Sequence, residues 1–324
     1  MHLLTRDEYG GFSLVHFYEG SVPPYAILSH TWGQDDDEVS FSDITVYRGT
    51  LQNRLTRKPG YQKLQFCAEK AATHGLHHFW VDTCCINKQS DRELSEAINS
   101  MFRWYQRAAR CYVYLSDFTL SDGWQKFAEA RWFTRGWTLQ ELLAAKRADF
   151  YDSNEEHLGD KDSLAEWITS TTGIPRAALQ GRPLSSFSVE ERLSWAQHRQ
   201  TKREEDGAYS LLGIFDVSMP LIYGEGRDKA YGRLLYEVES SGQTSKVYQR
   251  YSQYLPFTES PDLGKALGKA IDPTPETHTS MSTPQQPPGQ EMVPSWDDDL
   301  KRYIQVHWSE QYQRHYRRHY VEGM

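Results

Sequence analysis

The sequence has little of what secreted, membrane-spanning and nucleic-acid-binding proteins depend on. Its 324 residues include four cysteines, too few for the disulfide framework of a small secreted domain. No apolar run approaches the roughly 18–20 residues of a membrane span, and the N-terminus lacks the apolar core of a signal peptide. The formal net charge of -8 disfavours nonspecific binding to nucleic acid or anionic membranes, because both need a basic surface. We therefore expect a cytoplasmic protein with no membrane span and no nucleic-acid partner.

Motifs for several common catalytic sites are also missing. The 12 histidines show no metal-ligand spacing, and no Gly-x-Ser-x-Gly elbow of a hydrolase appears. Gly224 and Gly226 precede a predicted helix as an anion cradle would, but without the spacing of a P-loop. We interpret the two glycines as a tight loop, with an anion cradle as the alternative. The sequence predicts no metal and no resident cofactor.

Composition divides the chain at about residue 245. The first part, residues 1–245, holds enough aromatic and aliphatic residues for a sizeable core. The second part, residues 246–324, is rich in proline, serine, threonine and glutamine. Such a segment buries too little apolar surface to offset the entropy that ordering costs. We predict one folded domain followed by a largely disordered tail.

Short apolar runs alternate with helical periodicity between about residues 20 and 152. The runs predict strands at 25–29, 79–81, 111–115 and 148–151. The periodic segments predict helices at 61–74, at 91–108 after a capping box that begins at Ser90, and at 131–145. The polar segment 34–58 is predicted to be mostly loop. This alternation is typical of an α/β fold whose parallel sheet is flanked by helices.

A helical extension follows from about residue 153 to 245. Apolar periodicity and a second capping box, Ser188 with Glu191, predict additional C-terminal helices. Their expected positions are 158–171, 188–196, 208–215 and 228–239.

Polar side chains follow the predicted strands where each strand ends. The first strand ends in Ser29, His30, Trp32 and Gly33, the second in Asp82 and the third in Ser116. Parallel α/β sheets build their sites at this carboxyl edge, so these residues are candidates for binding a polar substrate. The alternative for the first group is a simple turn in which Gly33 takes a positive φ. Asp82 has a similar alternative as a helix cap.

Glu141 is the candidate catalytic residue. Trp137 precedes it by four positions, which places the ring and the carboxylate on one helix face. An apolar ring beside a carboxylate raises its pKa and can aim it at a cationic transition state. The alternative is a partly exposed glutamate that pairs with Arg131 or Arg135.

Cys84 and Cys85 follow Asp82 directly. They could act as nucleophiles or as a redox pair, but the segment supplies no paired base. We interpret them as small buried hydrophobic residues, with redox control as a weaker alternative.

Several ordered segments together resemble the heterokaryon incompatibility (HET) domain of filamentous fungi. They are YAILSHTWG, FWVDTCCINKQSDRELSEAINSMFRWYQRA, CYVYL, RWFTRGWTLQELLA and EEDGAYSLLGIFDVSMPLIYGEG. The resemblance covers roughly residues 1–240. It implies a part in self/non-self recognition after hyphal fusion, in which allelic mismatch triggers programmed cell death. It also implies partners among other incompatibility proteins or NOD-like sensors, and self-association.

HET domains are in turn similar to TIR domains, whose parallel sheet is flavodoxin-like. Some TIR domains cleave NAD+ with a glutamate in a Trp-x-x-x-Glu pattern, and Glu141 matches that position. The resemblance implies NAD+ as a substrate, with Trp32 or Trp137 stacking on one of its rings. Two hypotheses follow: an effector that hydrolyses NAD+, or a non-enzymatic HET adaptor that signals by self-association or partner binding.

Overall fold

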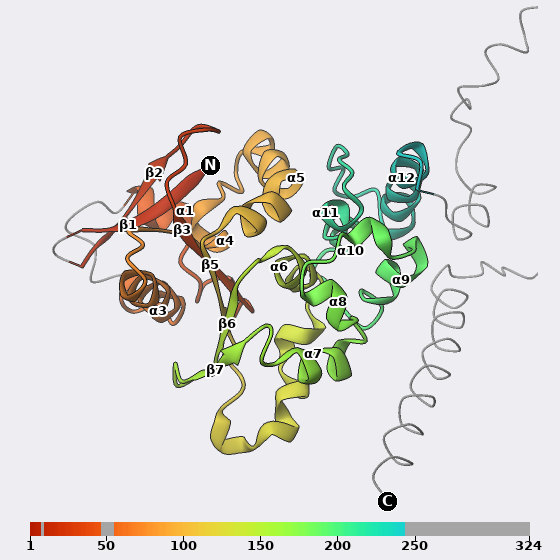
Figure 1. Cartoon of the computed structure of the whole chain (residues 1–324). Helices are drawn as coiled ribbons and strands as arrows, with labels where there is room; N and C mark the ends of the chain where they lie inside the picture. Colours follow the sequence, from red (N-terminus) through yellow and green to blue (C-terminus); the bar gives the residue numbers. More distant parts are fainter. Residues whose placement is uncertain (8–9, 47–54, 244–324) are drawn as a thin grey trace, which may run out of the picture. The chain divides into compact units, whose positions relative to one another are not determined.

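The computed structural model describes residues 1–7, 10–46 and 55–243 (Figure 1). The predicted disordered tail of residues 246–324 lies outside the described residues. In the described part of the chain, no helix is long and apolar enough to cross a membrane.

Seven strands form one mixed sheet within the described residues. Their order across the sheet is β2-β1-β4-β3-β5-β6-β7. The strands are β1 (His2–Arg6), β2 (Phe12–His16), β3 (Tyr25–His30), β4 (His78–Trp80), β5 (Arg110–Tyr114), β6 (Ala148–Tyr151) and β7 (His157–Asp160).

The four central strands are parallel, which confirms the predicted α/β class. β3 pairs in parallel with β4 on one side and β5 on the other, and β5 pairs in parallel with β6. Across the sheet the parallel strands stand in the order β4-β3-β5-β6. Numbered along the chain this order is 2-1-3-4, as in the first four strands of a flavodoxin-like sheet. The chain direction across the sheet reverses between β3 and β5, and that point is where such sheets bind ligands.

Antiparallel strands extend both sides of the parallel core. β1 pairs with β4 and with β2, and β7 pairs with β6. The sequence analysis predicted neither the hairpin of β1 and β2 nor β7. Both are edge elements with partly exposed residues, and they lack the continuous apolar run that marks a buried parallel strand.

Helices cover both faces of the sheet (Figure 1). α3 (Gly60–Thr73) packs on β3, β4 and β5 on one face, while α5 (Asp91–Arg107) and α6 (Thr138–Ala144) lie on the other. This double cover explains why all six residues of β3 are buried. α5 begins at the predicted cap, where the Ser90 hydroxyl accepts the Glu93 N–H at 3.3 Å.

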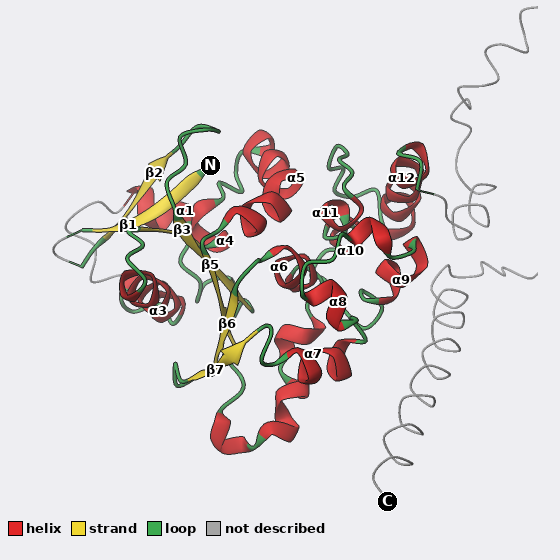
Figure 2. Ribbon diagram, in the orientation of Figure 1, coloured by secondary structure: helices red, strands yellow, loops and turns green. Residues whose placement is uncertain are grey.

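The remaining helices are short in most cases (Figure 2). They are α1 (Phe41–Val46), α4 (Asp82–Cys85), η1 (Leu120–Asp122), η2 (Trp124–Glu129), η3 (Arg131–Thr134), α7 (Ala165–Thr172), α8 (Arg176–Leu179), η4 (Leu184–Ser186), α9 (Val189–Ser194), α10 (Asp206–Tyr209), α11 (Leu212–Phe215) and α12 (Arg227–Ser240). The second capping box is present, because Ser188 and Glu191 exchange both hydrogen bonds. α12 lies where a helix was expected at 228–239.

Four local predictions were wrong in part. The polar segment 34–58 contains α1, and the expected helix at 208–215 is divided into α10 and α11. The expected helix at 158–171 begins only at α7, because residues 157–160 pair with β6 as β7.

The expected helix at 131–145 is broken between η3 and α6. The break occurs where Arg135 forms a parallel bridge with Gln200. The Gly136 N–H donates to the Gln200 carbonyl at 2.8 Å, and the Gln200 N–H donates to Thr134 at 2.6 Å. Hydrogen bonds to a distant segment thus replace the helical ones at this point.

Close packing of α11 on α5 makes Gly213 a sensitive position. A Cβ at Gly213 would lie 2.1 Å from the Cβ of Phe102. We expect Gly213→Ala to lower the free energy of unfolding by about 1–3 kcal/mol, the usual range for overpacking. Urea denaturation measures this change. Gly207→Ala is the control and should cost less, since its nearest contact is the end of the Tyr231 side chain at 3.1 Å.

Candidate functional site

The carboxyl edge of the parallel strands brings most of the predicted site residues together. Ser29 and His30 end β3, Asp82 follows β4, and Ser116 follows β5. Ser116 contacts the segment after β3, since its hydroxyl lies 3.1 Å from the Thr31 hydroxyl.

Glu141 lies against this edge, buried in the first two turns of α6. Its side chain is covered, with 5% of the residue exposed. The Ser29 hydroxyl donates to Glu141 Oε2 at 2.5 Å and itself accepts the Trp132 indole N–H at 2.8 Å. Burial, reinforced by the negative charge of Asp82, raises the pKa of Glu141 to about 8. The carboxyl is therefore mostly protonated at neutral pH.

Tyr105 of α5 forms the other side of the Glu141 environment. Its hydroxyl donates to the Leu28 carbonyl at 2.8 Å and is close enough to Glu141 to influence the pKa of that carboxyl. The nearby Tyr105 hydroxyl lowers the pKa of Glu141, against the larger effect of burial. Ser29 supplies a donor for the ionised carboxyl.

His30 lies between two carboxylates. Its Nδ1 is 3.8 Å from Asp82 Oδ1 and its Nε2 is 3.9 Å from Glu38 Oε2. Both separations are too long for hydrogen bonds. Three of these atoms, His30 Nε2, Glu38 Oε2 and Asp82 Oδ1, are buried and have no hydrogen-bond partner among the described residues. Burial, with the positive charges of Lys63, Lys88 and Arg135, holds the pKa of His30 well below its usual value. The imidazole is therefore neutral and lies between the carboxylates of Asp82 and Glu38.

Trp32, half-buried, lies beside Asp82 in the segment after β3. Its indole N–H donates to Asp82 Oδ2 at 2.7 Å, and the ammonium of Lys88 sits 3.6 Å from the centroid of its ring. The alternative interpretation of this segment was a turn in which Gly33 takes a positive φ. Gly33 does not take a positive φ. Its N–H donates to Glu38 Oε1 at 2.7 Å, and Lys63 pairs with the same carboxylate.

Trp137 does not join the other predicted residues. It stands at the start of α6, and its indole N–H points to Asp206 Oδ2 of the helical extension at 3.3 Å. Trp132 instead supplies the indole that reaches Glu141, through Ser29. Neither proposed ion pair of Glu141 forms a hydrogen bond: Arg131 pairs with Asp117 at 3.2 Å, and Arg135 acts on Glu141 only through its charge.

The helical extension holds the start of α6 in place. Arg199 Nη1 donates to the Arg135 carbonyl and to the Thr138 hydroxyl, both at 2.8 Å. The Thr138 hydroxyl donates in turn to the Trp132 carbonyl at 2.6 Å. At the other end of α6, the buried ammonium of Lys161 donates to the carbonyls of Leu142 and Ala145, which suits the negative end of the helix dipole.

Sequence reasoning missed Trp132, Tyr105, Glu38 and Arg199 as members of this site. Trp132 had a signal, because it stands in the same aromatic and arginine-rich segment as Glu141. The other three come from distant segments whose approach depends on tertiary packing, and no spacing in the sequence announces them.

The two remaining candidate motifs have structural partners. Cys84 and Cys85 are buried in α4, and burial raises the pKa of the Cys84 thiol well above its usual value, which disfavours a thiolate nucleophile. The N–H groups of Gly224 and Gly226 both donate to Glu205 Oε1, at 2.8 and 3.1 Å. The chain's own carboxylate therefore fills the cradle. No cluster of metal-ligating side chains occurs in the residues that the structure describes.

The raised pKa of Glu141 predicts a specific dependence of stability on pH. Between about pH 4.5 and 8 the folded chain keeps a proton that the unfolded chain has released. The contribution of Glu141 to the free energy of unfolding is therefore complete below pH 4.5. It decreases as pH rises toward 8, by at most about 1.4 kcal/mol per pH unit. We expect Glu141→Gln to gain stability relative to the parent chain from pH 5 to 9 in urea denaturation.

The exposed Glu129 provides the control for this measurement. Glu129→Gln should give a stability curve parallel to that of the parent chain. A parallel curve for Glu141→Gln as well would contradict a buried, protonated carboxyl.

Comparisons with known proteins match this region. The family model described as heterokaryon incompatibility protein (HET) matches residues 25–123, which hold every candidate site residue except Trp137 and Glu141. Vegetative incompatibility protein HET-E-1 of Podospora anserina is 51% identical over 243 residues, which are 72% of this chain and 18% of that protein. The chain thus spans less than a fifth of the length of this curated relative. No solved structure matches the chain.

Proposed function

Because the chain belongs to the HET family, we propose that it acts in heterokaryon incompatibility as an effector of programmed cell death that cleaves NAD+. Similarity to a vegetative incompatibility protein supports the cellular role. The chemistry is proposed from the resemblance to TIR domains, together with the geometry around Glu141. Other incompatibility proteins or NOD-like sensors are its proposed partners.

The observation that carries the chemical proposal is the position of Glu141. A carboxyl with a raised pKa is buried at the carboxyl edge of a parallel sheet, bonded to Ser29 at the end of β3. β3 borders the point where chain direction reverses, the usual ligand site of such sheets. Buried groups with strongly shifted pKa values are concentrated at catalytic sites.

The proposed reaction is hydrolysis of the bond between nicotinamide and ribose. The electron pair of that bond leaves with nicotinamide, which departs neutral, and the ribose carbon becomes an oxocarbenium ion. The Glu141 carboxylate stabilises this cation, as carboxylates do in glycoside hydrolysis. Water then adds to the carbon and releases one proton, giving ADP-ribose. His30, Asp82 and Ser116 are proposed to bind the substrate's hydroxyl groups, with Trp32 stacked on a ring.

Substrate entry requires a second conformation of the segment after β3. Glu141 and His30 are covered in the described conformation, with 5% and 6% of each residue exposed. In this segment Trp32 bonds to Asp82, and the ammonium of Lys88 lies over its ring. An exposed ion pair between Asp35 and Lys202 also ties this segment to the helical extension. Such exposed pairs contribute little to stability, so this pair permits opening.

The decisive test is NAD+ consumption by the full chain and by Glu141→Gln, at low and at high protein concentration. We expect cleavage by the parent chain and a loss of at least about 100-fold in kcat for Glu141→Gln, since a group that stabilises the transition-state charge is removed. Glu129→Gln, which changes an exposed glutamate, should retain full activity. Equal cleavage by Glu141→Gln would refute the catalytic role.

The pH profile of kcat/KM provides an independent test. If the ionised carboxyl is the active form, activity must rise with pH as Glu141 loses its proton. The midpoint should lie at about 8, the pKa of Glu141 in the free protein. A profile that is flat from pH 6 to 9, measured where the fold is intact, would contradict this role for Glu141.

A non-enzymatic adaptor that signals by self-association is the second candidate. It is favoured by the covered state of Glu141 and by the exposed Trp167, which stacks on the half-buried Trp124 with ring centroids 5.6 Å apart. Absence of NAD+ cleavage together with concentration-dependent assembly in sedimentation would support this function. A chain that stays monomeric and cleaves NAD+ would exclude it.

A further inference from the structure

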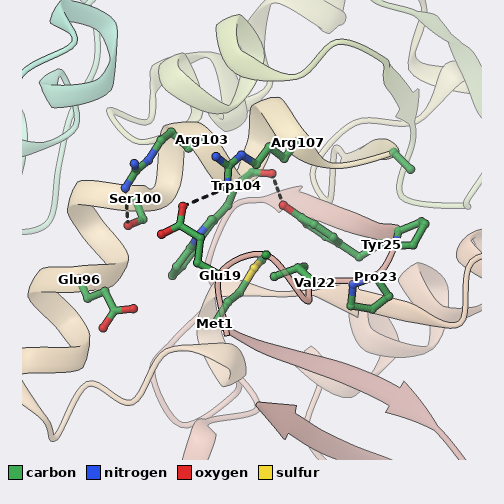
Figure 3. Close-up of a pocket in the computed structure, with 13 residues that line it drawn as sticks. Met1, Glu19, Val22, Pro23, Tyr25, Glu96, Ser100, Arg103, Trp104 and Arg107 are labelled. Carbon is green, nitrogen blue, oxygen red and sulfur yellow. Dashed lines mark hydrogen bonds and ion pairs between the residues drawn. The ribbon is translucent and has the colours of Figure 1, made fainter. Parts of the chain in front are cut away.

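A cavity of about 440 Å³ lies at the opposite edge of the sheet from Glu141 (Figure 3). One wall is the segment of residues 19–25 that leads into β3, and the other is a face of α5. Tyr25 begins β3, whereas Ser29 lies near its end, so the cavity and the candidate site occupy opposite ends of one strand. The volume falls in the usual range of small-molecule sites.

Two guanidinium groups project from the α5 wall. Arg103 and Arg107 are four residues apart, and such residues share a helix face. Arg103 Nη2 donates to the Ser100 hydroxyl at 3.3 Å, and no described carboxylate pairs with Arg103. Arg107 pairs across the cavity with Glu19 at 3.2 Å. Glu96 also lines the cavity, but it lies about 10 Å from Arg103 along the helix axis.

The indole of Trp104 lines the same wall of the cavity as the two arginines. The carbonyl of Trp104 accepts the Tyr25 hydroxyl at 2.6 Å, and its indole packs edge to face on Trp80 at 5.6 Å. Figure 3 shows Trp104 lying between Arg103 and the wall that carries Val22 and Pro23. These apolar groups give the cavity a surface that suits a ring.

Glu19 marks the position that a ligand's anionic group would take. Its carboxylate is supplied by the facing wall, and the side chains of Glu19 and Arg107 are 73% and 59% exposed. An exposed pair of this kind contributes little to stability. A phosphate or carboxylate bound to both guanidinium groups would make stronger, charge-assisted hydrogen bonds and displace Glu19.

We propose that this cavity is a binding site for a small organic anion in which a phosphate or carboxylate is attached to a flat ring. The anionic group binds Arg103 and Arg107, and the ring lies against Trp104. The proposal does not depend on NAD+ cleavage, because no residue of the cavity belongs to the Glu141 site.

Titration calorimetry on the full chain tests the proposal with phenyl phosphate and with benzoate. Phenol supplies the ring alone, and inorganic phosphate supplies the anion alone. We expect saturable binding of phenyl phosphate, benzoate or both, at least about tenfold tighter than binding of either partial probe. Tighter binding of one of the two anions identifies the source of the charge. Dissociation constants above about 10 mM for both anions, or equal binding of inorganic phosphate, would overturn the proposal.

Variants assign the binding to this cavity. Arg103→Gln and Arg107→Gln should each weaken the bound probe about tenfold or more, because each removes a charge-assisted contact. Glu19→Gln should tighten binding severalfold, since it removes the competing carboxylate. Arg92→Gln, on an exposed first-turn position of the same helix, and Glu129→Gln are the matched controls and should change nothing.

The expected changes in affinity are opposite, because Arg107→Gln should weaken binding and Glu19→Gln should tighten it. Weaker or unchanged binding in Glu19→Gln, or unchanged binding in both arginine variants, would overturn the assignment. Glu141→Gln should bind the probe as the parent chain does. This variant separates the two proposals, because loss of NAD+ cleavage in it leaves the anion site intact.

Discussion

The hydrogen bond between Ser29 and Glu141 joins the two halves of the site. It links the end of the central strand β3 to helix α6 across 112 residues of sequence, inside a part of the chain that excludes water. A carboxyl in such a place costs free energy when ionised, so the fold holds it protonated, with Ser29, Trp132 and Tyr105 arranged around it. This ionisable residue lies at the carboxyl edge of the parallel strands, and stability alone gives no reason for it there.

The residues around Glu141 separate naturally into a fixed group and a movable group. Ser29, Trp132 and Tyr105 are buried and bonded to backbone or to each other, which fixes the geometry of the carboxyl. The half-buried Trp32 and the exposed Lys88 lie beside the site and are held by one hydrogen bond and one cation–π contact. A site of this design can be opened without dismantling the groups that tune the carboxyl.

The sequence predicted the parallel core well, for a physical reason. A strand buried on both faces must be apolar throughout, and a helix that packs on a sheet must have one apolar stripe, so both patterns are visible in β3, α3 and α5. Edge strands such as β2 and β7 are partly exposed, so their sequences lack the continuous apolar run that identifies a buried strand. The break before α6 could not be predicted from the local sequence. It depends on hydrogen bonds to Gln200, which lies 64 residues beyond Gly136.

The same reasoning explains why the sequence identified the polar residues at the strand ends but missed the side chains that contact them. Strand ends are readable, so Ser29, His30 and Asp82 were identified together. The choice between Trp132 and Trp137 depended on where α6 begins, and a helix continued back to residue 131 would have placed Trp137 on the face of Glu141. With α6 starting at Thr138, Trp137 turns to Asp206 and Trp132 turns to Ser29. The helical extension thus determines which indole serves the site, through the contacts of Arg199 and Gln200 with residues 134–138. The α/β core and the helical extension therefore have to be regarded as one functional unit.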